Sequence, residues 1–373
     1  MGEHVRCTHR ALARAAVNAN VMDIYGLSTP EPAQQREFGP LQTARFGDIN
    51  IFHINGDEVR QAMAHVTYNT PLTGYNIVYP AWELAMYPAE WAEQLDRFDE
   101  IWAPSQFIAD SLAAACKKPI HHMPLGTEVM LQDFLPRKRF GIPEADLVFL
   151  FFFDLKSYLE RKNPRAVLQA FRNVMLKRPY ARARLVIKAN GFDETQTSHI
   201  AFRDDVLALG GQAQLLTETL TDEQVKNLVR CCDCFVSLHR SEGFGRGIAE
   251  AMYLGKPVVA TGYSGNMDFM TPDTSYVVDH ALVPVKEGQY PFASGQFWAE
   301  PDVDHAARLM GAVLDEPLAA AAMGQRARLH MIREFSYRPT GVRYRDRLDA
   351  IANGSAPRDE LQGGFNSITE KNT

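Results

Sequence analysis

One stretch of the chain, SLHRSEGFGRGIAEAMYLGKPVVAT (residues 237–261), carries most of the information about the fold. It begins in an apolar, β-rich run, passes through a loop with three glycines, and continues as a helical pattern that ends at Gly255 and Pro257. A second β-branched run, residues 258–260, follows. The pattern predicts a strand, a glycine loop, a helix and another strand, which is the repeating unit of a parallel α/β sheet.

The glycine loop predicts an anion-binding site. Gly243, Gly245 and Gly247 precede the helix, and glycine lets backbone N–H groups approach a ligand closely. The unpaired N–H groups and the helix dipole favour negative charge at this end. Glu242 and Glu250 flank the loop, and carboxylates accept hydrogen bonds from hydroxyls. Such a site suits a nucleotide sugar; the alternative is an ordinary αβ turn with surface glutamates.

Length and composition are those of a globular protein with room for two α/β domains. The chain has 373 residues, of which 46% are hydrophobic and 23% charged. Its formal net charge of −6 argues against a dedicated nucleic-acid binder. No apolar run approaches the ~20 residues of a membrane span, and the N-terminus lacks an apolar signal region.

Three of the five cysteines, Cys231, Cys232 and Cys234, lie close together in the sequence. A metal site is one interpretation, but no second Cys or His pair has the spacing of metal ligands. The cluster also fits a helix end followed by a buried strand. We therefore expect small buried thiols, no metal, and a reducing, cytoplasmic compartment.

Apolar, β-branched runs alternate with helical patterns along the whole chain, which predicts two successive doubly wound units. The predicted strands are residues 21–25, 49–54, 76–79, 101–103 and 120–123, then 147–153, 184–187, 214–216, 234–238, 257–260 and 276–278. The predicted helices include residues 90–97 and 105–115, with Ser105 as N-cap, and residues 163–176, 221–231 and 247–253.

The glycine-loop stretch resembles the E-x7-E motif of retaining GT-B glycosyltransferases of family 4, also called glycosyltransferase group 1. Glu242 and Glu250 occupy the two glutamate positions of S-E-G-F-G-x-x-x-x-E-A-M-x-x-G-K-P-V-V-A-T. The resemblance covers residues 145–300 strongly and the first part of the chain weakly. It implies a GT-B fold, in which two doubly wound Rossmann-like domains face a cleft.

The resemblance also implies a division of the chain. The chain is expected to consist of an acceptor-side domain (residues 1–127), a linker (128–145), a nucleotide-sugar-binding domain (146–327), a helix that crosses back to the first domain (328–351) and a disordered tail (352–373).

Donor-binding roles follow from the same resemblance. Glu242 is expected to bind the hydroxyls of the donor sugar, and Glu250 those of the ribose. The backbone of Gly243, Phe244 and Gly245 is expected to meet the phosphates. A second glycine turn, with Gly265 and Asn266, is expected to approach the donor sugar.

A basic loop is expected to contact the diphosphate. The family carries an Arg and, about five residues later, a Lys after the first strand of the second domain. Lys162 matches that Lys, but the Arg position falls on Ser157. Arg161 or Lys156 is then expected to compensate, and the alternative is a solvated basic loop.

The acceptor side departs from the family pattern. Members often carry a His after the strand that corresponds to residues 76–79, where this chain has Ala81-Trp82-Glu83. One interpretation gives Glu83 the role in sugar binding, with Trp82 as an apolar platform. The other is a packing Trp and a Glu at a helix start.

The motifs together predict a cytoplasmic retaining glycosyltransferase, working at the inner face of the membrane through peripheral contact. It would move a hexose from a GDP- or UDP-sugar to a saccharide or lipid-linked acceptor, in bacterial surface-polysaccharide or lipopolysaccharide synthesis. We expect no metal or other cofactor and no nucleic-acid partner. Two alternatives remain open. One is a non-catalytic nucleotide-sugar-binding protein, and the other is an inverting transferase or epimerase of the same fold.

The N-terminus departs from the family as well. The chain opens with MGEHVR and a helical pattern to Ala15, whereas the family begins with a strand and a glycine turn. We therefore expect the first strand of the N-terminal domain to be missing, through truncation or an upstream start, and this domain to be the less stable one.

Overall fold

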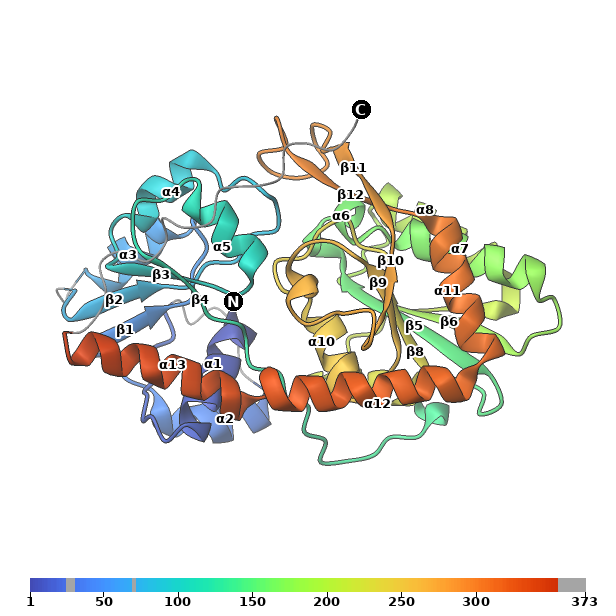
Figure 1. The fold of residues 1–373 in the computed structure, drawn as a ribbon, viewed down its shortest axis with the longest axis horizontal. Helices are drawn as coiled ribbons and strands as arrows, with labels where there is room; N and C mark the ends of the chain where they lie inside the picture. Colours follow the sequence, from blue (N-terminus) through green and yellow to red (C-terminus); the bar gives the residue numbers. More distant parts are fainter. Residues whose placement is uncertain (25–30, 69–71, 355–373) are drawn as a thin grey trace. The chain divides into compact units, whose positions relative to one another are not determined.

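The computed structural model describes residues 1–24, 31–68 and 72–354 and divides into two compact units (Figure 1). The first comprises Met1–Trp82, Met86–Leu125 and the chain from Tyr337 onward. The second comprises Glu83–Ala85 and Gly126–Ser336. The predicted disordered tail lies outside the described residues except for residues 352–354.

The first unit is built on a parallel four-stranded sheet with the order β1-β2-β3-β4. Each of the four strands overlaps a predicted run, although β2 and β3 begin one residue before the predicted start. The strands are β1 (Ile49–Phe52), β2 (Tyr75–Val78), β3 (Glu100–Ala103) and β4 (Ile120–His122). The helices are α1 (Gly2–Arg14), α2 (Pro32–Phe38), α3 (Val59–Val66), α4 (Ala89–Leu95) and α5 (Gln106–Ala113).

Ser105 is the N-cap of α5, as predicted. Its side-chain oxygen accepts a hydrogen bond from the Ile108 N–H at 3.3 Å. This bond satisfies one of the N–H groups that the first turn of a helix leaves unpaired, which is why the helix begins here.

The predicted strand at residues 21–25 is wrong for the residues described. Val21 makes only an isolated bridge with Gln42, and the residues from Tyr25 to Pro30 lie outside the description. Two apolar residues followed by Asp23 are too few to hold a ladder, so pairing stops after one bridge. The element that opens the chain is helix α1, as the helical pattern predicted.

The second unit contains a parallel six-stranded sheet with the order β10-β9-β8-β5-β6-β7. Each predicted strand of this part is present, and β5 is buried along most of its length, as its unbroken apolar run indicated. The strands are β5 (Leu147–Asp154), β6 (Ala183–Asn190), β7 (Ala213–Leu216), β8 (Cys234–Ser237), β9 (Val258–Thr261) and β10 (Tyr276–Val278).

Helices cover this sheet. The apolar faces of α7 and α11 pack into one core with the strands, and α10 packs against α9 and α12. The helices are α6 (Leu159–Lys162), α7 (Pro164–Lys177), α8 (Thr197–Leu207), α9 (Asp222–Cys231), α10 (Arg246–Tyr253), α11 (Val303–Asp315) and α12 (Pro317–Glu334). The three clustered cysteines are buried free thiols, as expected.

An antiparallel hairpin of β11 (His280–Pro284) and β12 (Phe297–Pro301) follows the sheet and was not predicted. Strand β11 is mostly exposed, so its sequence lacks the apolar alternation that marks a half-buried strand. Helix α8 was also missed, and it buries only Phe202 and Val206.

The helix α13 (Tyr337–Ala352) packs against α1 in the first unit (Figure 1). Gly341 makes this approach possible, because a Cβ at that position would lie 1.9 Å from the carbonyl oxygen of Ala11. The tight contact joins the first and last helices that the structure describes.

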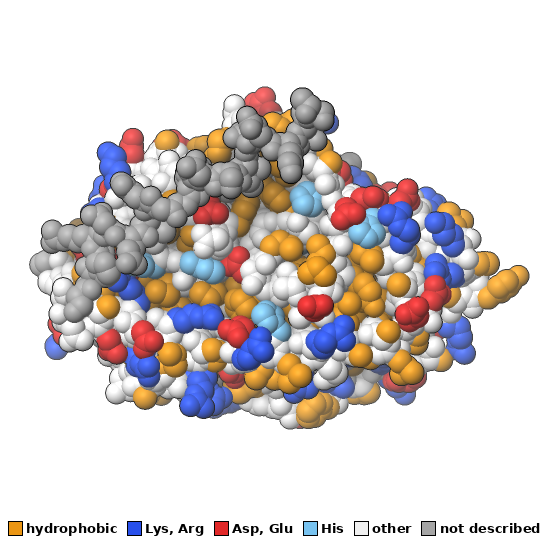
Figure 2. All heavy atoms as spheres, viewed as in Figure 1, with side chains coloured by type: hydrophobic (Ala, Val, Ile, Leu, Met, Phe, Trp, Pro, Cys, Tyr) orange, Lys and Arg blue, Asp and Glu red, His pale blue; other side chains and the backbone are white. Residues whose placement is uncertain are grey.

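Basic and acidic side chains are interspersed on the face drawn in Figure 2. Among the residues described, no helix combines the length and apolar character that crossing a membrane requires.

Candidate functional site

The candidate site lies where the chain order of the six-stranded sheet reverses. The chain runs from β5 outward to β6 and β7, then returns to β8 on the other side of β5. Ligands of open α/β sheets bind at such a switch point, beyond the carboxyl ends of the strands. The loops that follow β5 and β8 carry the basic residues and the E-x7-E glutamates, so the topology brings these two motifs together.

The loop after β5 aims Arg161 and Lys162 at the loop after β8. It passes through two residues with left-handed backbone, Tyr158 at φ 63° and Asn163 at φ 50°, on either side of the short helix α6. Asn tolerates this conformation better than most residues, which fits its place before Pro164 at the start of α7.

Lys162 and Arg161 both contact Glu242. The Lys162 Nζ lies 2.5 Å from Glu242 Oε1, and the Arg161 Nη1 lies 3.4 Å from Oε2. Arg161 also donates to the Ser241 carbonyl at 2.9 Å and approaches Glu83 Oε1 at 3.7 Å. Arg161 is therefore buried between the carboxylates of Glu83 and Glu242, and Lys162 pairs with Glu242.

The surrounding charges determine which groups are ionised. Burial alone would raise the pKa of Glu242, but Lys162 and Arg161 outweigh it and lower that pKa to about 2. Burial lowers the pKa of Lys162, partly offset by Glu242. Burial also lowers the pKa of His239, so its imidazole is neutral. Glu242 is consequently an ionised acceptor that has no proton to give near neutral pH.

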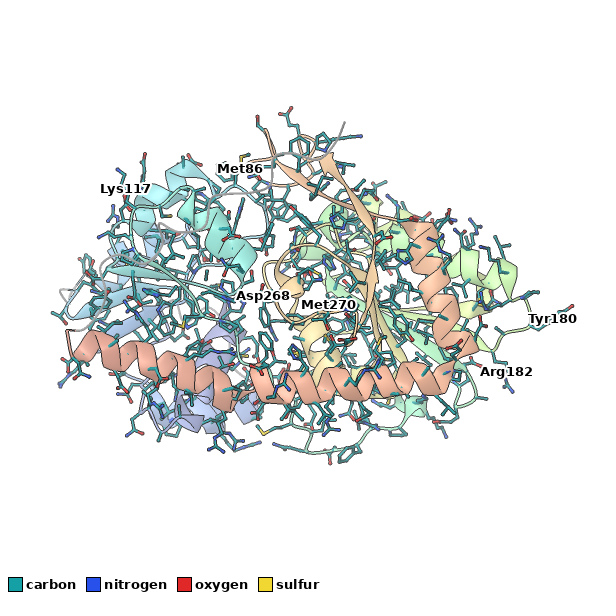
Figure 3. All side chains as sticks on the ribbon, in the orientation of Figure 1. Met86, Lys117, Tyr180, Arg182, Asp268 and Met270 are labelled. Atoms are coloured by element: carbon teal, nitrogen blue, oxygen red, sulfur yellow. The ribbon has the colours of Figure 1, made fainter. Side chains whose placement is uncertain are left out.

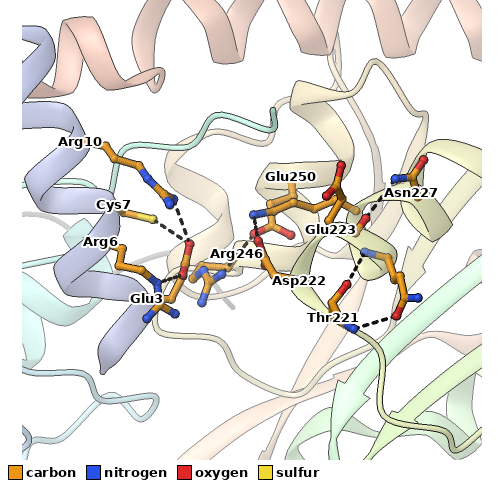
Figure 4. A network of polar contacts seen from close by, with 12 residues as sticks. Glu3, Arg6, Cys7, Arg10, Thr221, Asp222, Glu223, Asn227, Arg246 and Glu250 are labelled. Carbon is orange, nitrogen blue, oxygen red and sulfur yellow. Dashed lines mark hydrogen bonds and ion pairs between the residues drawn. The ribbon is translucent and has the colours of Figure 1, made fainter. Parts of the chain in front are cut away.

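The loop between Glu242 and α10 leads into the N-terminus of that helix. Gly245, the residue before α10, has φ 90°, a conformation that glycine adopts without strain. Phe244 is buried against Phe269, with ring centroids 5.2 Å apart, and anchors the loop. Glu250 lies further along α10 and is paired with Arg246 at 3.2 Å, as Figure 4 shows.

The second glycine turn packs directly on this loop. The Gly265 amide donates to the Glu242 carbonyl at 2.9 Å, and a Cβ on Gly265 would lie 2.2 Å from the Gly243 carbonyl oxygen. Asn266, in the short helix η5 (Gly265–Asp268), is buried and lies 3.0 Å from the His239 ring nitrogen. The structure thus brings Gly243, Gly265 and Asn266 together as one unit.

Glu83 joins this cluster although it follows β2 in the chain. Its carboxylate receives a hydrogen bond from the Tyr290 hydroxyl at 2.5 Å, and its backbone carbonyl accepts from the Ser241 hydroxyl. Trp82 is buried against Tyr87 and Trp91, so the packing interpretation holds for this residue.

Lys188 and Lys156 make local contacts. Lys188 is buried on β6, and its ammonium donates to the Ala189 carbonyl at 3.2 Å. Lys156 and Ser157 lie in η3 (Leu155–Ser157), and the Lys156 amide donates to Asp154 Oδ1 at 2.8 Å. Within the loop after β5, Arg161 and Lys162 are the basic residues that contact Glu242.

Two contributors to the site were missed. Ser264 Oγ accepts a hydrogen bond from the Glu242 amide at 2.8 Å, and Tyr290 approaches from the β11–β12 loop. The position of Ser264 directly before the glycine turn at Gly265 could have indicated its role. Nothing local marks Tyr290, because its role depends on a hairpin that the sequence pattern did not reveal.

Among the described residues, no group of three or more His, Cys, Asp or Glu side chains is arranged to hold a metal ion. The chain does contain an Asp-x-Asp pair, Asp302 and Asp304, at the start of α11. Asp302 caps that helix by accepting from the His305 amide at 2.9 Å, and Asp304 accepts from Asn173 at 2.9 Å. Both side chains thus have contacts in and around α11.

Comparison with known proteins agrees with this geometry. Residues 136–330, more than half of the chain, match the family described as Glycosyl transferases group 1. The human Alpha-1,3/1,6-mannosyltransferase ALG2 is 24% identical over 264 residues, which are 67% of this chain and 58% of the relative. A second relative is the GDP-mannose-dependent monoacylated alpha-(1-6)-phosphatidylinositol monomannoside mannosyltransferase of Corynebacterium glutamicum. It is 26% identical over 240 residues, 60% of this chain and 54% of the relative. The chain therefore spans less than two thirds of the length of these curated relatives.

Solved structures share the fold. The Anabaena Alr3699/HepE structure in complex with UDP and glucose has a TM-score of 0.65 at 14% identity, covering 94% of this chain and 96% of that one. A glycosyltransferase from Rickettsia africae has a TM-score of 0.66 at 14% identity, covering 94% and 95%. These likenesses show the predicted GT-B fold with two Rossmann-like domains. On the family match, this chain belongs to the glycosyl transferases group 1.

Proposed function

We propose that this protein is a retaining glycosyltransferase that moves a hexose from a nucleoside-diphosphate sugar to a saccharide or lipid-linked saccharide acceptor. The observation that carries the proposal is the ionised Glu242, held between Lys162 and Arg161 at the switch point of the six-stranded parallel sheet. A cation, the amides of a glycine loop and a carboxylate at one point supply what a diphosphate and a sugar need.

The proposed reaction needs no nucleophile from the protein. The bond between the anomeric carbon and the phosphate oxygen breaks, and the acceptor oxygen bonds to the same face of the sugar. The acceptor proton passes to the departing phosphate. Lys162 and the amides before α10 stabilise the charge on that phosphate, while Glu242 orients the sugar hydroxyls.

Metal independence is part of the proposal. The positive charge opposite the diphosphate comes from Lys162, the loop amides and the α10 N-terminus. We expect turnover to persist in EDTA; loss of turnover that magnesium or manganese restores would show that a metal supplies this charge.

The relatives guide the choice of donor. The two curated relatives are mannosyltransferases by name, and one is named as GDP-mannose-dependent. The HepE structure holds UDP and glucose. We propose a GDP- or UDP-linked hexose, with GDP-mannose as the first donor to test and UDP-glucose as the second.

The proposed setting is the assembly of bacterial surface polysaccharide or lipopolysaccharide in the cytoplasm. A lipid-linked acceptor would place the enzyme at the inner face of the membrane through peripheral contact. The name of the Corynebacterium relative, which acts on a phosphatidylinositol mannoside, supports an acceptor of this kind.

The decisive experiment is a panel of nucleotide sugars screened first by thermal stabilisation and then by product analysis. A donor at 100 times its dissociation constant adds about 2.7 kcal/mol of stability. The product of the stabilising donor is examined by NMR, and retention of the anomeric configuration is expected. Stabilisation without turnover across a panel of acceptors would favour a nucleotide-sugar-binding protein. An inverted product would favour an inverting transferase.

A further inference from the structure

The β11–β12 hairpin is fixed to the loop that carries Glu242. The Ala299 amide of β12 donates to the Arg240 carbonyl at 3.0 Å. The Arg240 side chain pairs with Glu300 at 2.7 Å and covers the Trp298 ring at 5.4 Å. The hairpin is therefore docked at the candidate site on one side, and its connecting residues 285–296 extend from that anchor.

Tyr290 belongs to this connection and contacts three members of the site. Its hydroxyl donates to Glu83 Oε2 at 2.5 Å, and its ring centroid lies 5.7 Å from the Arg161 guanidinium carbon. Tyr158 meets the same ring edge-on at 4.7 Å. Only 8% of Tyr290 is exposed, so a large aromatic side chain is buried against a charged cluster.

The phenol keeps its proton throughout the pH range in which the protein would work. Burial raises the pKa of Tyr290, and the neighbouring Glu83 carboxylate raises it further. The hydroxyl is consequently a permanent donor to Glu83, and a hydrogen bond from a neutral donor to a carboxylate is among the stronger ones.

We propose that Tyr290 is a positioning residue for the sugar-transfer site, which fixes the Glu83 carboxylate through its hydroxyl and the Arg161 guanidinium through its ring. The inference rests on the proposed function. It adds a third segment, the β11–β12 loop, to the two motif loops that form the site. Glu83 keeps 23% of its side chain exposed, so its carboxylate remains open to a substrate hydroxyl while Tyr290 fixes its direction.

A double-mutant cycle tests the role. Tyr290→Phe removes only the hydroxyl and leaves the ring over Arg161. We expect its kcat/KM to fall roughly tenfold to a hundredfold, the range for losing a hydrogen bond to a charged group. In a Glu83→Ala background, where position 83 no longer offers a side-chain acceptor to the Tyr290 hydroxyl, the same substitution should change kcat/KM by no more than about twofold. Glu83→Asp, whose shorter side chain withdraws the carboxylate from the Tyr290 hydroxyl, serves as the background if Glu83→Ala is too slow to measure.

The matched control is Tyr180→Phe. Tyr180 projects from the end of the loop after α7 (Figure 3) and is 96% exposed, so we expect wild-type kinetics. Melting temperatures of all variants are measured alongside. A purely structural role predicts a lower melting temperature for Tyr290→Phe with kcat and KM unchanged, which overturns the proposal.

The remaining outcomes are also distinct. An equal loss in both backgrounds would show that Tyr290 does not act through Glu83, and the proposal would be wrong. If the wild-type protein neither binds nor turns over any nucleotide sugar of the panel, the proposed function fails first and this inference fails with it.

Discussion

The two glutamates of the E-x7-E motif have different partners. Glu242 is paired with Lys162 at 2.5 Å, the cation expected to meet the diphosphate. Glu250 is paired with Arg246 on its own helix at 3.2 Å. If the protein has the proposed function, a diphosphate would compete with Glu242 for Lys162, whereas ribose binding would leave that pair untouched.

We expect the two residues to affect nucleoside-diphosphate affinity in opposite directions. Glu242→Gln frees Lys162 and removes a negative charge from the phosphate site, a gain of about 1–2 kcal/mol or roughly five- to thirtyfold in affinity. Its turnover should fall, because the sugar loses a charged acceptor. Glu250→Ala should weaken binding about tenfold to a hundredfold by removing the proposed ribose acceptor.

Calorimetric titration with GDP and UDP measures both effects. Weaker binding by Glu242→Gln would show that Glu242 does not compete for Lys162. Unchanged affinity of Glu250→Ala would remove Glu250 from the nucleotide site.

His53 is a second residue whose surroundings determine its charge. It directly follows β1, is buried against the Tyr79 ring at 5.0 Å, and its Nδ1 has no hydrogen-bond partner among the described residues. Burial lowers its pKa from 6.5 to about 3. The folded protein thus excludes a proton that the unfolded chain takes up below pH 6.5.

This depressed pKa predicts acid lability of the first unit. The stability that comes from neutral His53 is complete above pH 6.5 and is lost as the pH falls toward about 3. The loss amounts to about 1.4 kcal/mol per pH unit. Urea unfolding of His53→Phe between pH 4 and 6.5 should show a pH slope shallower by that amount. The exposed His65→Gln is the control, and an unaltered slope in His53→Phe would contradict the assignment.

At the scale of elements, the site depends on two glycine turns in direct backbone contact. A side chain on Gly265 would overlap the Gly243 carbonyl oxygen, which would lie 2.2 Å from its Cβ. The contact is between backbones, so no side-chain rotation can relieve it. The turn after β9 and the loop before α10 must therefore move apart when Gly265 is replaced.

Gly265→Ala should consequently lower turnover by about a hundredfold, the usual effect of a 1 Å misplacement at a reacting centre. Gly211→Ala is a matched control, because a Cβ at Gly211 meets nothing within 4 Å. Steady-state kinetics and melting temperature are measured for both. Wild-type kcat in Gly265→Ala would show that the two turns tolerate separation.

At the scale of the whole molecule, a buried ion pair holds the last described helix to the first unit. Glu100 at the start of β3 is fully buried, and Arg347 of α13 contacts both of its carboxylate oxygens, with Nε at 3.2 and 3.3 Å. The Trp102 indole and the Tyr75 hydroxyl donate to the same carboxylate at 2.7 and 3.0 Å. The final segment of the chain thus completes the polar contacts of a strand near its beginning.

Breaking this pair should destabilise the first unit strongly. Arg347→Met leaves the Glu100 charge buried and without its cation, which costs about 3–5 kcal/mol. Arg345→Met, on the same helix but in an exposed pair with Asp346, should cost about 1 kcal/mol or less.

Hydrogen exchange in β3 and α13, together with urea unfolding, distinguishes the two variants. The double variant Glu100→Gln/Arg347→Met should recover part of the loss, because no buried charge remains. Equal stability of Arg347→Met and wild type would show that the pair does not hold α13.

Much of the fold could be predicted, because its signals are local. Each strand of the six-stranded sheet is an apolar run long enough to be recognised, and Ser105 caps α5 through an atom three residues from its partner. The β11–β12 hairpin was not predicted, because β11 is mostly exposed and its sequence lacks the alternation of apolar and polar residues. The strand predicted at residues 21–25 did not form as a ladder, because β-branched residues alone do not supply a neighbouring strand to pair with.

The sequence by itself determined the family, the parallel α/β units, and the motif loops that carry Glu242, Glu250 and Lys162, since these depend on residues close together in the chain. Tertiary structure alone decided that Arg161 lies between the carboxylates of Glu83 and Glu242. It also decided that Tyr290 reaches Glu83 from 207 residues away. The physical reason is that contacts between distant segments depend on how sheets and hairpins pack, and short-range patterns do not record that packing.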